Sequence, residues 1–373
     1  MTRPRVPALA GALAGLVFLA GCEAVAGGPP RARGEAEEIL VVTDSATWAG
    51  PAGEAIRAEL APPVPTLPSN QGAFRLRFQR LDPRLLDQLK LMPNVVFAAP
   101  VDAPGPIGEF IRARVGEGNL GAVRRGDAAA LNVRPDLWAE DQLVVVATAA
   151  DEEALARQFL ESGGRLRRAF DDLARDRTAD EMFARLRQTD LEDELLAAHD
   201  FRVQIQHDYV PVQDTSARVA GREGDFVRYR RVLSDTWRDF FVYVEDGVES
   251  VPAEPELDRL TNALLEEFVR GTEDSSFVQI DDQRPIRTGA AEIAGRPAVE
   301  TRGLWYMTND VMGGAFVRYA FVDEATDRLY VYYGMTFAPS RQLDKRKFLR
   351  QMEALAYTFR TRADLAAEGP PES

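Results

Sequence analysis

Two histidines, His199 and His207, are the only imidazole side chains available for acid–base chemistry or for binding a metal. Each is followed by an aspartate, so the pairs at 199–200 and 207–208 would have to converge in the fold to form a zinc site. We expect instead that His199 ends a helix, where a cation meets the negative end of the helix dipole, and that His207 lies at the edge of the core. The sequence therefore predicts no metal and no cofactor, with the two histidines as weak metal candidates only.

The sequence motifs of common enzymes are also missing. The sequence has no GxSxG motif to present a nucleophilic serine and no GxxxxGK[ST] phosphate loop. Gly116 to Gly121 fits GxGxxG, but the preceding residues have the apolar spacing of a helix, whereas a dinucleotide-binding loop follows a strand. We therefore predict no catalytic residues and no nucleotide ligand.

The single cysteine, Cys22, stands where it could carry a lipid. Arg3 and Arg5 are followed by an apolar stretch, 6–20, that is too short to span a bilayer. The stretch ends in LAGC at 19–22, which resembles the bacterial lipoprotein signal, a small-residue cleavage site directly before a cysteine. The resemblance implies that residues 1–21 are a signal peptide and that Cys22 becomes the first mature residue, carrying palmitate or similar acyl chains. We expect a protein anchored in the cell envelope, on the periplasmic side of the outer membrane.

The charge balance narrows the range of partners. The chain has 45 Lys and Arg against 59 Asp and Glu, a formal net charge of −14. Nucleic acid is therefore not expected as a partner, because phosphate binding needs clustered basic side chains. Anionic lipid headgroups add little attraction for so acidic a chain, so its contact with the membrane must come through the N-terminal lipid.

A change in hydrophobic pattern along the chain predicts the domains. A flexible Gly- and Pro-rich tether at 22–36 precedes an N-terminal α/β layered domain at 37–150, in which apolar runs at 39–42, 95–99 and 143–147 predict buried strands between helices. Residues 151–199 show only helical spacing, with a break expected at Gly163-Gly164, and form a helical connector. Strands with two long helices at 200–360 predict a C-terminal antiparallel α/β sandwich, followed by a disordered tail at 361–373. The fold class is α+β.

Long stretches of the chain resemble an uncharacterised family of bacterial envelope lipoproteins. They are RGLWYMTNDVMGGAFVRYAFVDE at 302–324, FAPSRQLDKRKFLRQMEALAYTF at 337–359 and, near the start, EILVVTDSATWAGPAGEAIRAELAPPVPTLP at 38–68. The family is known only as domain of unknown function 4837, so the resemblance implies an envelope location and a shared architecture but no activity. The last part of the chain is also loosely similar to PsbP-like folds, which are mostly interaction modules.

One segment has the residue types of a recognition surface. On the strand predicted at 298–307, Arg302 lies on one face and Trp305 on the other, and a polar loop with a methionine and two glycines follows. Glycines permit close approach of another backbone, and Trp and Met give adaptable apolar contact. The candidate binding residues are Arg302, Trp305, Asp310, Met312, Gly313 and Gly314. The alternative is that Trp305 fills the core and the glycines only make a turn.

A second candidate is a group of arginines on the neighbouring predicted strands. These are Arg228, Arg230, Arg231, Arg238 and Arg318. They form either an anion-binding face or a solvated strand edge.

These patterns favour a lipid-anchored envelope protein that acts as a non-enzymatic binding module for an envelope protein or polymer. One alternative is a carboxylate- or metal-dependent hydrolase of envelope glycans or peptides, because so acidic a surface must bring some carboxylates within reach of each other. The other is a small-ligand carrier, which would need a deep pocket.

Overall fold

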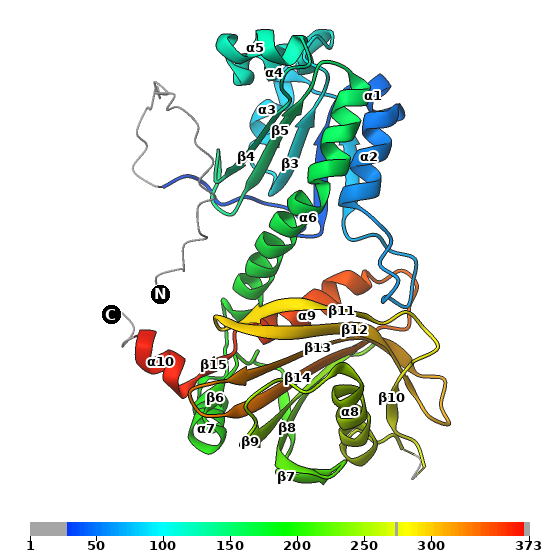
Figure 1. Cartoon of the computed structure of the whole chain (residues 1–373), viewed down its shortest axis with the longest axis vertical. Coiled ribbons are helices and arrows are strands. Elements are labelled where there is room, and N and C mark those ends of the chain that lie inside the picture. The colour runs from blue at the N-terminus through cyan, green and yellow to red at the C-terminus, as the bar shows by residue number, and fades with distance from the viewer. Residues whose placement is uncertain (1–27, 273–274, 369–373) are drawn as a thin grey trace.

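The structure, a computed structural model, describes residues 28–272 and 275–368 and contains two α/β domains joined by a long helix (Figure 1). The predicted signal peptide and Cys22 lie outside the described residues. The α+β fold class is confirmed, with a mainly parallel five-stranded sheet in one domain and an antiparallel eight-stranded sheet in the other. No helix within the described ranges is both long enough and apolar enough to cross a bilayer.

The N-terminal domain has helices on both faces of its sheet, whose strand order is β2-β1-β3-β5-β4. The three apolar runs predicted as buried strands are confirmed as β1, β3 and β5, which pair in parallel and are almost wholly buried. The elements are β1 (Glu38–Val42), α1 (Ser45–Ala49), α2 (Pro51–Leu60), β2 (Arg75–Gln79), the short 3-10 helix η1 (Pro83–Leu85), α3 (Leu86–Leu89), β3 (Asn94–Ala98), α4 (Gly105–Val115), α5 (Glu117–Arg124), β4 (Ala130–Pro135) and β5 (Leu143–Thr148).

The predicted flexible tether, 22–36, is too long at its C-terminal end. Arg31 pairs with Asp141 at 2.5 Å and with Asp180 at 2.6 Å, and the backbone amide of Ala32 donates to the carbonyl oxygen of Glu140. These contacts hold the chain against the N-terminal domain from residue 30 onward, since Glu140 also donates its amide to the carbonyl oxygen of residue 30.

The prediction of a disordered tail is wrong for residues 361–368. Strand β15 (Arg360–Thr361) pairs with β6 (Phe201–Arg202), and helix α10 (Arg362–Glu368) follows directly. Asp364 accepts a hydrogen bond from the Thr361 amide and pairs with Arg296 at 2.9 Å. These bonds fasten the end of the described chain to the C-terminal domain.

The predicted break at Gly163-Gly164 is also wrong, because α6 (Glu152–Phe183) runs through both glycines as one helix of 32 residues. A Cβ atom at Gly163 would lie only 2.3 Å from the Cβ of Glu59 on α2, so this glycine lets the two helices pack closely. A Cβ at Gly164 would meet only a guanidinium nitrogen of Arg168, at 4.0 Å. The first glycine serves helix packing, and the second does not break the helix.

The C-terminal domain is a three-layer sandwich, as predicted, with strand order β10-β12-β13-β14-β9-β8-β7 and β11 paired with β12. Helix α8 packs on one face through Leu260 and Leu264, and α9 packs on the other through Met352 and Leu355. The elements are α7 (Thr189–His199), β6, β7 (Val210–Val219), β8 (Arg222–Val232), β9 (Trp237–Asp246), α8 (Glu254–Phe268), β10 (Val278–Ile280), β11 (Arg287–Ile293), β12 (Arg296–Met307), β13 (Gly313–Asp323), β14 (Arg328–Phe337), α9 (Lys345–Tyr357), β15 and α10.

The predicted connector at 151–199 is divided between the two domains. Leu155, Phe159 and Phe170 of α6 belong to the core of the N-terminal domain, and Leu195 of α7 belongs to the core of the C-terminal domain. The lower part of α6 reaches the C-terminal domain and lies near α9 (Figure 1).

Candidate functional site

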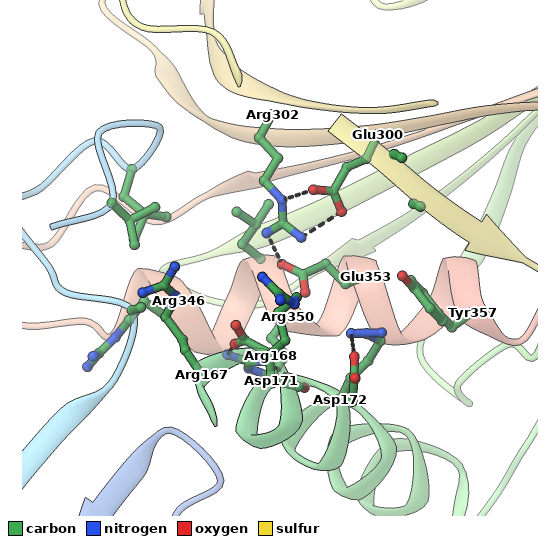
Figure 2. Close-up of a pocket in the computed structure, with 17 residues that line it drawn as sticks. Arg167, Arg168, Asp171, Asp172, Glu300, Arg302, Arg346, Arg350, Glu353 and Tyr357 are labelled. Atoms are coloured by element: carbon green, nitrogen blue, oxygen red, sulfur yellow. Dashed lines mark hydrogen bonds and ion pairs between the residues drawn. The ribbon is translucent and has the colours of Figure 1, made fainter. Parts of the chain in front are cut away.

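A cavity of about 520 Å³ lies between the two domains (Figure 2). It is open to solvent on one side and is lined by α6 from the N-terminal domain, by β11, β12 and α9 from the C-terminal domain, and by the loop between α2 and β2. Its volume is in the range of small-molecule sites, which often lie between domains. The charged residues that line it are Arg167, Arg168, Asp171, Asp172, Arg175, Glu300, Arg302, Arg346, Arg350 and Glu353. We call this space the interdomain cavity.

Helical spacing places the charges on two helices that face each other across the cavity. Asp171 of α6 pairs with Arg350 of α9 at 2.9 Å. About one turn further along α6 and two turns further along α9, the Arg175 guanidinium lies 3.8 Å from the centre of the Tyr357 ring. The two contacts advance together, so α6 and α9 run in the same direction along the cavity.

Arg302 is the centre of an ion-pair network on the wall formed by the C-terminal domain. Its guanidinium donates two hydrogen bonds to Glu300, at 2.7 and 2.8 Å, and one to Glu353, at 2.5 Å. The Tyr319 hydroxyl donates a further bond to Glu300 at 2.7 Å. Burial opposes ionisation of Glu353, but Arg302 and Arg350 outweigh it and hold the pKa of Glu353 below its usual value. Glu353 therefore stays ionised at neutral pH, where it holds Arg302 and does not donate a proton.

Arg350 joins the two domains at the floor of the cavity. It contacts Asp171 through both the carboxylate and the backbone oxygen, and its Nε lies 3.5 Å from Glu37. The Arg350 side chain is only 7 % exposed, and its Nε has no hydrogen-bond acceptor in the described structure. Burial raises the pKa of both Asp171 and Glu37 although Arg350 opposes the change. Carboxyl groups perturbed in this way are typical of functional cavities.

Arg167 and Arg168 differ from the other four arginines because neither contacts a carboxylate of the described residues. Arg167 donates from Nη1 to the backbone oxygen of Glu59 at 2.5 Å. Arg168 is exposed and makes no hydrogen bond or ion pair with the part of the chain that is described. Arg346, by contrast, pairs with Asp344 at 2.7 Å. Two guanidinium groups at one end of the cavity are thus free to bind an anion.

The structure separates the six residues predicted as one binding surface. Arg302 lines the interdomain cavity, whereas Trp305 is 1 % exposed in the core on the other face of the sheet. The Trp305 indole donates to the backbone oxygen of Thr336 at 3.2 Å. A Cβ at Gly314, which pairs with Trp305 across β12 and β13, would lie 1.9 Å from that oxygen. Trp305 and Gly314 therefore pack in the core and do not form part of a surface for a partner.

The other three predicted residues lie at the turn between β12 and β13. Asp310 is exposed, and Met312 packs against the core under α8. Gly313 pairs with Tyr306, and a Cβ there would lie 2.8 Å from the Trp305 backbone oxygen. Only Arg302 of the predicted set lies in the interdomain cavity.

The two histidines lie in different surroundings. His199 ends α7, as predicted, and lies beside a smaller cavity of about 280 Å³, with Nε2 3.0 Å from Asp214 and Nδ1 3.4 Å from Asp225. His207 is exposed in a turn after β6, so its predicted place at the core edge is wrong. No cluster of three or more His, Cys, Asp or Glu within the described residues could hold a metal ion.

The arginines of the second candidate form no open anion-binding face. Arg228 and Arg230 both pair with the buried Asp239, each at 2.7 Å. Arg318 is 0 % exposed and pairs with Asp258 at 2.8 Å. The two remaining arginines are paired or buried as well. These cations stabilise the interior of the sheet and its edges.

Two family models match the chain. Residues 188–358 match a domain of unknown function (DUF4837). The matched range covers the C-terminal domain from α7 to the end of α9, so this domain is similar to the DUF4837 family. Residues 32–183 match a second domain of unknown function (DUF8532). The stretch at 38–68, which we expected from its sequence to belong with DUF4837, therefore falls within a different family match. A comparison with curated proteins gave no match.

The boundary between the two matched ranges falls between α6 and α7. The interdomain cavity is consequently built from both families. The α6 wall comes from the DUF8532 domain, and the β12 and α9 walls come from the DUF4837 domain.

Proposed function

We propose that this protein is a lipid-anchored envelope protein that binds a small ligand in the interdomain cavity and does not transform it. The observation that carries the proposal is the cavity itself, which has walls from two family domains and two arginines without a carboxylate partner. A concave space of this volume between two helices and a sheet favours a small molecule, or the end of a polymer, over a broad protein surface. The lowered pKa of Glu353 makes this residue unsuited to act as a general acid, because a general acid needs a raised pKa.

Ligand binding is tested by filling the cavity. Ala291, on β11, lines the cavity, and its neighbour Glu292 does not. In native mass spectrometry of protein purified from its own membranes, we expect wild type and Glu292→Trp to retain a bound small molecule and Ala291→Trp to lose it. A molecule retained equally by all three proteins, or by none, would contradict the proposal.

Lipid anchoring is tested separately, on the residue that the sequence predicts to be acylated. The full-length Cys22→Ser protein, expressed in its bacterial host, is expected to lose all labelling by radioactive palmitate and to move from the membrane fraction to the soluble fraction, because no second cysteine is present. Glu23→Gln, one residue further on, should keep both the label and the membrane location. Unchanged membrane association of Cys22→Ser would refute the anchor.

A further inference from the structure

We infer that the ligand of the interdomain cavity is an oxyanion, either a carboxylate or a phosphate monoester, that carries a short apolar group. The inference rests on the proposed function and names its ligand class. Its starting point is the difference between Arg167 and Arg168 and the other arginines of the cavity.

The absence of carboxylate partners at Arg167 and Arg168 is not due to a shortage of carboxylates. The chain has 59 acidic residues for 45 basic ones, and Arg302 and Arg350 each lie within ion-pair distance of two carboxylates. Six arginines but only four carboxylates line the cavity, so its walls are locally basic in a strongly acidic protein. Because a guanidinium offers a planar fork of donors, it suits carboxylate and phosphate oxygens better than neutral groups.

The cavity is polarised along the two helices. Because α6 and α9 run in the same direction, Arg346 lies at the same end as Arg167, and Glu353 and Tyr357 lie toward the other end (Figure 2). Asp344 already pairs with Arg346, whereas no carboxylate pairs with Arg167 or Arg168. An anion is thus attracted to the end where Arg167 and Arg168 lie, since Arg302 at the other end is already paired with Glu353.

One buried donor in the cavity has no acceptor. The Nε atom of Arg175 is buried, belongs to a residue that lines the cavity, and has no hydrogen-bond partner in the described structure, whereas the Nε atom of Arg350 faces Glu37 at 3.5 Å. Buried donors without acceptors are uncommon in native proteins, so the Arg175 Nε is a donor available to an acceptor in the cavity.

Apolar side chains lie next to the arginine end. Val64, Leu67 and Ala73 of the loop between α2 and β2 line the cavity together with Leu349 of α9. The loop is held at this end because Arg346 donates to its backbone at residue 72, at 3.0 Å. A ligand whose oxyanion reaches Arg167 and Arg168 would therefore place an adjoining apolar group against these side chains.

Isothermal titration of the full-length protein in detergent, with four small probes, tests the inference. Hexanoate and hexyl phosphate carry an anion and an apolar chain, hexanamide is a neutral analogue, and inorganic phosphate lacks the chain. We expect wild type to bind at least one of the two hexyl anions, to bind inorganic phosphate more weakly and not to bind hexanamide. The double variant Arg167→Gln/Arg168→Gln should bind the anion at least about tenfold more weakly, because two charge-assisted hydrogen bonds are lost. Arg165→Gln, on the same helix but outside the cavity, should bind like wild type.

Each outcome decides one question. Tighter binding of hexanoate than of hexyl phosphate, or the reverse, supports the inference and identifies the oxyanion. Equal binding of hexanamide, unchanged affinity of the double variant, or no binding of any probe overturns it. The proposed function is tested separately by the Ala291→Trp experiment. If that variant loses a neutral ligand, the proposed function holds and only the oxyanion inference is wrong. Melting temperatures of the variants, expected to equal that of wild type because Arg168 is exposed and Arg167 only partly buried, show that each is folded.

Discussion

Replacing Trp305 with alanine is expected to lower the free energy of unfolding by about 4 kcal/mol. The side chain is 1 % exposed and packs in the core between β12 and α8, with its ring centre 5.3 Å from that of Trp237. Its removal leaves a large cavity and removes the donor that satisfies the backbone oxygen of Thr336. Gly314 opposite cannot close the gap, because it has no side chain.

Tyr306→Ala is the matched control for this prediction. Tyr306 is the next residue on β12, points to the other face and is 39 % exposed, with a single side-chain hydrogen bond to Gln279. Urea unfolding of both variants, followed by circular dichroism, should give a loss for Tyr306→Ala of no more than about 1 kcal/mol. Equal losses in the two variants would mean that Trp305 does not lie in the core.

Replacing Arg302 with methionine is expected to lower the free energy of unfolding by about 3 kcal/mol, because two carboxylates then remain at a largely buried site without their shared cation. Arg302 makes three of the hydrogen bonds that satisfy Glu300 and Glu353. Arg168→Met changes another arginine of the same cavity that has no ion pair, so its effect should stay within about 0.5 kcal/mol.

The cost of Arg302→Met should depend on pH. The folded-state pKa of Glu353 lies below the ordinary value of 4.5, so wild type keeps the stability contributed by this pair above pH 4.5 and loses it as the pH falls through the depressed pKa. In the variant, acid protonates Glu300 and Glu353, which removes the cost of holding two buried charges without a cation. The difference in stability between the two proteins is therefore largest at neutral pH and narrows in acid. A difference that stays constant in urea titrations from pH 7 down to about pH 3 would contradict this account.

The N-terminal domain was largely predictable because its central strands are buried on both faces. Such strands have continuous apolar sequences, as at 39–42 and 143–147, and their short length and β-branched residues favour a strand over a buried helix. The edge strand β4 (Ala130–Pro135) was missed because it is half exposed and its alternation of apolar and polar residues covers only 131–134. Gly163 was misread because a glycine required for close helix packing has the same sequence signature as a helix end.

The interdomain cavity was not predictable from one sequence. Alternation along β12 correctly placed Arg302 and Trp305 on opposite faces, but it could not tell which face was the core. The charged face of α9 carries Arg346, Arg350 and Glu353 opposite its apolar stripe, a pattern that normally indicates solvent. Its partners on α6 are about 180 positions away in the sequence, so only the fold brings them together.

Helix α6 is a long, continuous connection between the two domains. With 32 residues it is about 48 Å long, and its two ends serve different domains. The chain that comes from the N-terminus is fastened to it by the pair between Arg31 and Asp180, close to its C-terminal end. A mechanical load on the N-terminal segment would therefore reach α6 about one and a half turns beyond Arg175, and the N-terminal domain through Asp141. A pull on the N-terminal segment and a ligand in the interdomain cavity would both act on α6. We therefore expect such a pull to change how tightly the cavity holds its ligand.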